Sequence, residues 1–117
     1  MTTDTPADFA VHAEREGRAY VVAPRGELDL GTVDEVRSVL ALRPHDCARV
    51  VIDLGGLTFF DTSGMRLIVE TLEDTRRQQI ELALVRGSDH VQRLFAVAQL
   101  EDRLPFFDDR DKALAGH

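Results

Sequence analysis

The sequence predicts one domain of the α/β class. Its 117 residues are about the usual size of a single domain. Hydrophobic residues make up 44% and charged residues 30% of the chain, which is an ordinary composition for a folded protein. Segments with the period of a strand alternate with segments with the period of a helix, as expected for strands joined by right-handed crossovers.

The first two elements are predicted to be strands. Residues 9–14 alternate between apolar and polar side chains, and Glu16-Gly17 provides a turn. Residues 19–23 form a run of strand-favouring residues, and Pro24 predicts that this strand ends or bulges before Gly26. We expect the two segments to pair as a hairpin.

A helix and a buried strand follow. Apolar residues recur at helical spacing over residues 32–42, Thr32 and Glu35 match a capping box, and Pro44 stops the helix. Residues 50–54 are almost continuously apolar, which is typical of a strand covered on both faces. We therefore expect this strand at the centre of the sheet.

The second half of the chain repeats the alternation. After the Gly55-Gly56 break, a short segment at 57–60 leads into a helix that runs to about Arg77. The pattern then predicts a strand at 80–85, a helix capped by Ser88 or Asp89, a short strand within 104–107 and a frayed helix at about 109–115. The predicted domain spans 9–112, between flexible ends at 1–8 and 113–117.

Charge and cysteine content limit the class of protein. Fourteen basic and twenty-one acidic residues give a net charge of −7, which disfavours direct binding to nucleic acid or to an anionic membrane. The single cysteine, Cys47, is expected to be a semi-buried or loop thiol without a redox role. No segment suits membrane insertion or a signal peptide, so we expect a cytoplasmic protein whose partners are proteins or small ligands.

The most informative motif is Asp61-Thr62-Ser63-Gly64, where a chain leaving a strand enters a helix. Its polar residues can simply cap the helix, which requires only one of them. A serine at an exposed helix start is also a suitable phosphoacceptor, because the positive end of the helix dipole favours a phosphate there. The motif leaves both interpretations open.

Three segments in order resemble the STAS-domain anti-sigma factor antagonists. These are Gly26-Glu27-Leu28-Asp29 with Thr32, then residues 51–54 followed by 60–64, then residues 91–95 with Leu100. The resemblance implies a mixed, mostly parallel sheet with packed helices, and a bacterial partner-switching protein. In that family the serine matching Ser63 is phosphorylated by an anti-sigma factor with serine kinase activity, and a serine phosphatase restores it. The unphosphorylated antagonist binds the anti-sigma factor and frees the sigma factor.

The resemblance also implies roles for individual residues. Ser63 is the expected phosphoacceptor, and the sequence does not decide whether Thr62 can substitute for it. The residues expected to support the phosphorylation site are Asp61, Thr62, Gly64 and Asp29, with Gly64 leaving the serine uncrowded. The residues expected to bind the partner are Glu27, Asp29, Phe60, Met65 and Arg66. One of the rings of Phe59 and Phe60 is expected to be buried and the other near the surface. Arg66 departs from the family pattern, in which a small residue is common, and so bears on which kinase is recognised.

Other functions fit the sequence less well. A serine hydrolase needs a base beside its nucleophile, but His12, His45, His90 and His117 are predicted on the surface. A phosphoreceiver domain would use Asp53 as its acceptor and bind Mg²⁺, but the additional acidic ligands are not evident. A STAS scaffold module within a larger signalling assembly is a further alternative. We expect no enzyme activity, no metal and no cofactor.

Overall fold

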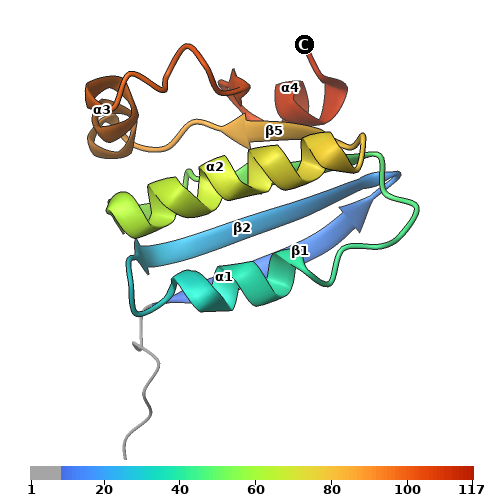
Figure 1. The fold of residues 1–117 in the computed structure, drawn as a ribbon, viewed down its shortest axis with the longest axis horizontal. Coiled ribbons are helices and arrows are strands. Elements are labelled where there is room, and N and C mark those ends of the chain that lie inside the picture. Colours follow the sequence, from blue (N-terminus) through green and yellow to red (C-terminus); the bar gives the residue numbers. More distant parts are fainter. Residues whose placement is uncertain (1–8) are drawn as a thin grey trace, which may run out of the picture.

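The computed structural model describes residues 9–117, which form a six-stranded mixed sheet and four helices (Figure 1). The sheet order is β1-β2-β3-β5-β6, and β4 pairs with β2. Only β1 and β2 pair antiparallel in this part of the chain, so the expected mostly parallel sheet is confirmed. The elements are β1 (Ala10–Glu16), β2 (Ala19–Leu28), α1 (Val33–Leu40), β3 (Arg49–Asp53), β4 (Leu57–Phe60), α2 (Thr62–Arg77), β5 (Glu81–Val85), α3 (Asp89–Val97), β6 (Phe106–Phe107) and α4 (Arg110–Ala115).

Strand β2 is longer than its sequence suggested, because it continues through Pro24. It pairs with β3 as far as Val22 and then with β4 from Gly26 onward, with a shift of register between Gly26 and Glu27. Pro24 lies between these two pairings, where the ladder on this side of β2 is interrupted. The predicted irregularity therefore exists, but the strand does not end there. Its extension carries Leu28 to the edge where α2 begins.

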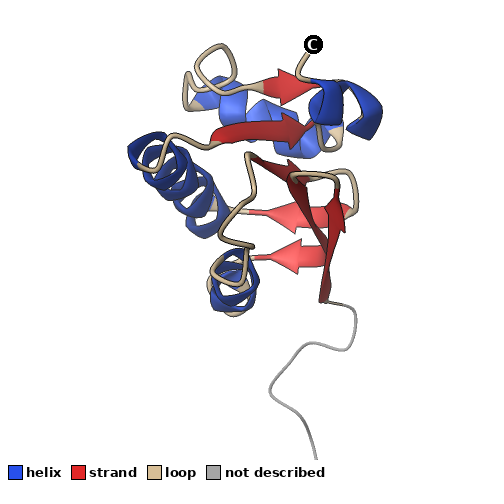
Figure 2. Cartoon of the chain, turned by 90° about the vertical axis from the view of Figure 1, so that its right-hand side faces the viewer, coloured by secondary structure: helices blue, strands red, loops and turns tan. Residues whose placement is uncertain are grey.

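The two faces of the sheet are covered differently. Helices α1, α2 and α3 pack against the face that contains most of the core, whereas α4 lies against the other face (Figure 2). Strand β3 is buried on both faces, since Val50, Val51 and Ile52 are at most 1% exposed, and this confirms its central position. On the main face the rings of Phe60 and Phe95 lie 5.1 Å apart.

Helix α4 is fixed to the second face by packing and by charge. Ala113 is fully buried against the cluster that includes Val21 and Val51. Arg110 donates from Nε and Nη2 to Oδ2 of Asp53, at 3.2 and 2.9 Å. The boundary predicted between residues 112 and 113 thus falls inside α4. The flexibility expected for 113–117 stays a prediction, and the segment 1–8 lies outside the described residues.

Two further expectations concern the cysteine and membrane insertion. Cys47 lies in the loop before β3 and is buried, so its loop position is as expected. Among residues 9–117, no helix is both long enough and apolar enough to span a bilayer.

Candidate functional site

The candidate site lies where two adjacent parallel strands end. Leu28 of β2 is paired with Phe60 of β4, so Asp29 and Asp61 each follow a paired residue at the same edge of the sheet. Helix α2 starts directly after Asp61, and α1 starts a few residues after Asp29. The register between two strands therefore brings the two distant sequence motifs together.

Asp61 begins α2 as its N-cap. Its backbone is extended, and its Oδ1 accepts a hydrogen bond of 2.9 Å from the amide of Ser63. The capping interpretation of the motif is thus right for Asp61. Within residues 9–117 the Ser63 hydroxyl makes no hydrogen bond to another protein group; Ser63 is half-buried and Thr62 is exposed. The cap thus satisfies the amide of Ser63 and leaves its hydroxyl free to react.

The loop beside this helix start is held by Thr32. Its buried hydroxyl donates to the carbonyl of Glu27 at 2.7 Å and accepts from the amide of Asp29 at 3.0 Å. The Oδ1 of Asp29 accepts from the amide of Gly31 at 2.9 Å. The predicted capping box of Thr32 and Glu35 is therefore wrong, because the Thr32 side chain turns back to the end of β2 and makes no capping bond to α1.

Gly64 has a packing role that the sequence did not indicate. It is buried on the underside of α2, where an added Cβ would lie 2.6 Å from Cε1 of Phe60 and 3.1 Å from Cδ2 of Leu28. Contacts below 3.0 Å between such atoms are not tolerated without movement. Gly64 thus permits the first turn of α2 to approach the sheet closely, whereas the sequence suggested only that it left Ser63 uncrowded.

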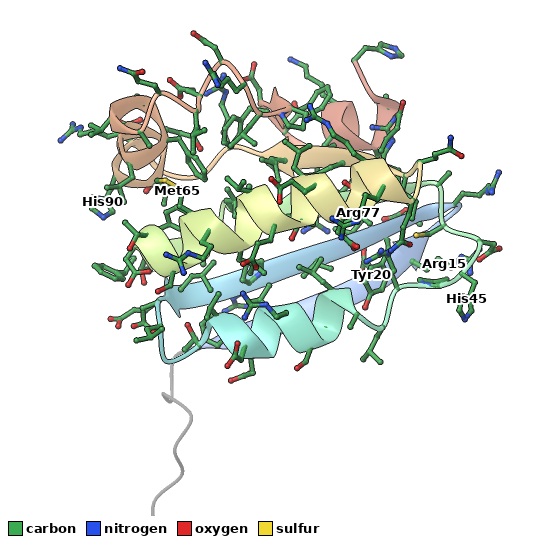
Figure 3. The ribbon with its side chains drawn as sticks, in the orientation of Figure 1. Arg15, Tyr20, His45, Met65, Arg77 and His90 are labelled. Carbon is green, nitrogen blue, oxygen red and sulfur yellow. The ribbon has the colours of Figure 1, made fainter. Side chains whose placement is uncertain are left out.

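One of the two neighbouring phenylalanine rings is buried and the other is exposed, as expected, but the buried ring is that of Phe60, which was expected to bind the partner. Phe60 is 1% exposed and belongs to the core, whereas Phe59 is 41% exposed. The Phe59 ring lies 6.3 Å from the ring of His90 on α3. Figure 3 shows His90 near Met65, at the end of the molecule where α2 begins. Phe59 is therefore an exposed apolar group near the site, as is Leu30, which is 79% exposed and lines the same hollow as Ser63. The buried position of Phe60 corrects its assignment to the partner surface.

The remaining predicted residues lie at the end of β2 and in the first turns of α2, and Arg66 lines the same hollow as Ser63. Glu27 and Arg66 are exposed, and Met65 is half-buried against the core. His90 is exposed, as predicted, but its closeness to Phe59 has no signal in the sequence, because α3 is far along the chain from β4. Arg37 of α1 also borders the site, and its hydrogen bond to Glu70 raises the pKa of its guanidinium.

The groups that a serine hydrolase or a receiver domain would use lie in other settings among residues 9–117. His12, His45, His90 and His117 are all exposed, as expected, and none bonds to Ser63. Asp53 is paired with Arg110, which also pairs with Glu14 at 3.7 Å, so the acceptor that a receiver domain would use is already bound to an internal cation. Within residues 9–117, no group of three or more His, Cys, Asp or Glu side chains is arranged to hold a metal ion.

Comparisons with known proteins agree on a family. A family model described as the STAS domain matches residues 10–113. An anti-sigma-B factor antagonist from Staphylococcus aureus (strain NCTC 8325 / PS 47) is 31% identical over 93 residues, which are 79% of this chain and 86% of that protein.

Solved structures share the fold. An anti-sigma factor antagonist from Mycobacterium paratuberculosis superposes with a TM-score of 0.83 at 21% identity, covering 95% of both chains. The anti-sigma factor antagonist SpoIIAA in its unphosphorylated form gives a TM-score of 0.76 at 20% identity, covering 91% of this chain and 93% of that one. The phosphorylated form of the Bacillus SpoIIAA gives 0.70 at 20% identity, covering 91% and 96%.

Proposed function

The chain belongs to the STAS-domain anti-sigma factor antagonist family, and from this premise we propose that it antagonises an anti-sigma factor under the control of phosphorylation at Ser63. The unphosphorylated chain binds an anti-sigma factor that has serine kinase activity, and so frees a sigma factor. Phosphorylation of Ser63 ends the binding, and a serine phosphatase reverses it. On this proposal the chain is a cytoplasmic bacterial regulator, not an enzyme, and needs no cofactor.

The observation that carries the proposal is the uncommitted hydroxyl of Ser63 in the second residue of α2. Asp61 already satisfies the amide of Ser63, so the fold does not need the hydroxyl. A surface hollow of about 320 Å³ lies beside the serine and is bordered by Thr62 and Ser63. The side chain is thus open to a kinase, and a phosphate placed on it remains in contact with water.

A phosphate at this position is tolerated by the domain itself. Its charge of about −1.5 to −2 faces the positive end of α2, which favours it by about 0.3 to 1 kcal/mol at an exposed site. Ser63 is only half-buried and is not one of the buried core residues. We therefore expect modification without unfolding.

The same phosphate is costly in a packed interface. An unpaired charge buried between two proteins costs about 2 to 5 kcal/mol, which corresponds to a loss of about 30- to 4,000-fold in affinity. The net charge of −7 adds repulsion against an acidic partner, although salt screens its long-range part. Phosphorylation thus acts on the interface more than on the fold.

The proposed partner surface surrounds Ser63. It comprises Glu27 and Asp29 at the end of β2, the exposed Phe59, and Met65 and Arg66 on α2. Phe59 replaces Phe60, whose ring is buried. A half-exposed aromatic ring among charged residues suits a protein interface, in which aromatic anchors are enriched.

The acceptor residue is tested by phosphorylation with a cognate anti-sigma kinase. Wild-type protein is expected to take up one acid-stable phosphate, Ser63→Ala none, and Asp53→Asn as much as wild type. Thr62→Ala controls for the neighbouring hydroxyl and should label normally. Labelling that survives in Ser63→Ala, or that disappears in Asp53→Asn, would contradict the proposal.

The partner is tested by capture from cells of the source organism. Ser63→Ala protein is expected to retain an anti-sigma factor identified by mass spectrometry, whereas Ser63→Asp protein is expected to lose it. Retention of one large assembly by both variants would instead favour the scaffold module.

A further inference from the structure

The hollow beside Ser63 contains two arginines in different states. It is lined on one side by Thr62, Ser63 and Arg66 of α2, and on the other by residues that include Asp34 and Arg37 of α1. Arg37 is fully engaged, because its guanidinium donates to Asp34 and, at 2.9 Å, to Glu70. Arg66 is exposed and makes no hydrogen bond or ion pair with any other residue in the stretch 9–117.

Arg66 makes no interaction that stabilises the unmodified fold among residues 9–117. A cation in the second turn of a helix gains nothing from the helix dipole, which favours cations only in the last turn. It buries no apolar surface that the core requires, since the core contacts of this turn are made by Gly64, Leu67 and Ile68. Besides its place on the proposed partner surface, its charge would gain an intramolecular partner from an anionic group added to the same hollow.

The spacing on the helix identifies that group. Ser63 and Arg66 are three residues apart, which places them on the same face of α2 with Cβ atoms about 5 to 6 Å apart. Long side chains on a helix lean toward its N-terminus, so the guanidinium of Arg66 extends over the turn that carries Ser63. Both residues line the same hollow. A phosphate on Ser63 would offer three acceptor oxygens within this space, and a guanidinium donates to two of them at once.

We propose that Arg66 is the phosphate-binding residue of this domain: it is unpaired while Ser63 is unmodified and forms an intramolecular ion pair with the phosphate once Ser63 is phosphorylated. The inference rests on the proposed function for the presence of a phosphate at Ser63. Phosphorylation then makes two charge changes at one point of the partner surface, because it adds a dianion and also withdraws a cation. Both changes lower the affinity for an acidic partner.

The nearby acidic groups leave Arg66 as the available cation. Asp61 at the helix start accepts from the Ser63 amide, Asp29 accepts from Gly31, and Asp34 is held by Arg37. These carboxylates repel a phosphate, so the phosphate needs a counter-charge within the hollow. Since Arg37 already serves Asp34 and Glu70, that role falls to Arg66.

The test measures the second pKa of the phosphoserine by ³¹P NMR, on full-length protein in which phosphoserine is introduced at position 63 during translation. Because a nearby cation favours the dianion, Arg66→Gln should raise the pKa of the phosphate above its wild-type value by about half a unit or more. Arg66→Lys, which keeps the charge but not the fork geometry, should fall between the two. Molar salt should reduce the difference.

A matched control removes the same charge from the same helix. Arg76 is exposed and lies about 20 Å from Ser63 along the axis at 1.5 Å per residue, so Arg76→Gln should leave the phosphate pKa unchanged. Equal phosphate pKa values in wild type and Arg66→Gln would overturn the proposal, as would a shift caused equally by Arg76→Gln. No kinase is used, so failure here leaves Ser63 phosphorylation untouched, and failure of the kinase experiments leaves this measurement unaffected.

Discussion

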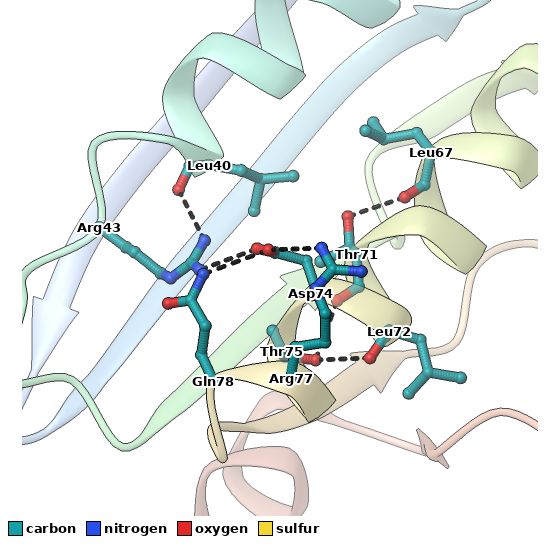
Figure 4. Close-up of polar contacts among 9 residues, drawn as sticks. All are labelled: Leu40, Arg43, Leu67, Thr71, Leu72, Asp74, Thr75, Arg77 and Gln78. Atoms are coloured by element: carbon teal, nitrogen blue, oxygen red, sulfur yellow. Dashed lines mark hydrogen bonds and ion pairs between the residues drawn. The ribbon is translucent and has the colours of Figure 1, made fainter.

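The two halves of α2 are attached to the rest of the molecule in different ways. In the C-terminal half, Asp74 accepts from Arg43 at 2.8 Å and also from Arg77 and Gln78, and the buried hydroxyls of Thr71 and Thr75 bond to backbone carbonyls of the helix (Figure 4). In the first turn, the Asp61 carboxylate is the one side chain that bonds to the backbone, and the Ser63 hydroxyl is unpaired within residues 9–117.

This difference separates the part of α2 that stabilises the fold from the part that carries the proposed phosphorylation site. The C-terminal half joins α2 to the segment after α1 through Arg43, whose side chain is only 13% exposed. The first turn packs closely against the sheet at Gly64 and is capped by Asp61. Its opposite side, which faces solvent, makes few contacts with the rest of the protein. A charge added to that surface therefore meets few interactions on which the fold depends.

The largest expected effect comes from filling the space beneath the first turn. Gly64→Val would place carbon atoms against the ring of Phe60, and we expect a loss of about 3 kcal/mol in the free energy of unfolding, at the upper end of ordinary overpacking. Urea denaturation measures this loss. Valine is a better helix former than glycine, so helix propensity does not explain a loss of stability in Gly64→Val. The control is Glu73→Val, which places a valine on the exposed face of the same helix and should cost under about 1 kcal/mol. Equal stability of Gly64→Val and wild type would mean that the close approach is not needed.

Removal of the cap is the next largest change. Asp61→Ala leaves the amide of Ser63 without its side-chain acceptor, and we expect a loss of about 1 kcal/mol. Asp61→Asn retains an accepting oxygen and should cost little. Amide hydrogen exchange should quicken at Ser63 and Gly64 in the alanine variant and stay slow beyond Asp74. Faster exchange along the whole helix would contradict the separation of its two halves.

The ion pair in the C-terminal half should show a characteristic pH dependence. The hydrogen bond from Arg43 holds the pKa of Asp74 below its usual range, and burial opposes this to a smaller extent. The stabilisation is therefore present above the unfolded pKa of about 3.9 and is lost as the pH falls through the lower pKa of the folded state. Because the Asp74 side chain is 36% exposed, we expect Asp74→Asn to cost at most about 1 kcal/mol at pH 7.

Stability measurements at pH 7 and pH 3 distinguish this pair from a general charge effect. The difference between wild type and Asp74→Asn should narrow at pH 3, whereas Glu73→Gln, a change at an exposed neighbour, should be neutral at both. A difference that is the same at both pH values would show that the ion pair contributes nothing.

The smallest effect is expected at Ser63 itself. Ser63→Ala removes a hydroxyl that has no partner in the described fold and keeps the amide that Asp61 caps, so the free energy of unfolding should change by less than about 0.5 kcal/mol. Thermal unfolding gives the value. A loss above about 1 kcal/mol would identify the hydroxyl as a structural group and would weaken its assignment as a free acceptor.

Sequence patterns were sufficient to predict the helices and strands, and to place Ser63 at the start of a helix. The helix predicted to end near Arg77 does so, and the strand at β3 is central because its apolar run requires two covered faces. The motif beginning at Asp61 lies at a helix start, as its polar residues indicated. These features depend on neighbouring residues in the chain, so local patterns predict them.

The features that the sequence did not predict depend on how the chain folds back on itself at the ends of β2 and β4. Thr32 has the spacing of a cap, but its hydroxyl reaches Glu27 because the end of β2 turns back beside it. Gly64 resembles a helix weakener, yet its role follows from the ring of Phe60 beneath it. Whether Phe59 or Phe60 is exposed depends on how β4 pairs with β2. None of these contacts is encoded in local periodicity.

The most direct test of the account compares unmodified and Ser63-phosphorylated protein in two measurements on the same samples, the melting temperature and the affinity for the anti-sigma kinase. The account predicts melting temperatures within about 4 °C, since a change of about 1 kcal/mol shifts a domain of this size by only a few degrees. It also predicts an affinity lower by about 30- to 4,000-fold for the phosphorylated form. A phosphorylated protein that unfolds at a much lower temperature, or that binds the kinase as tightly as the unmodified protein, would contradict it.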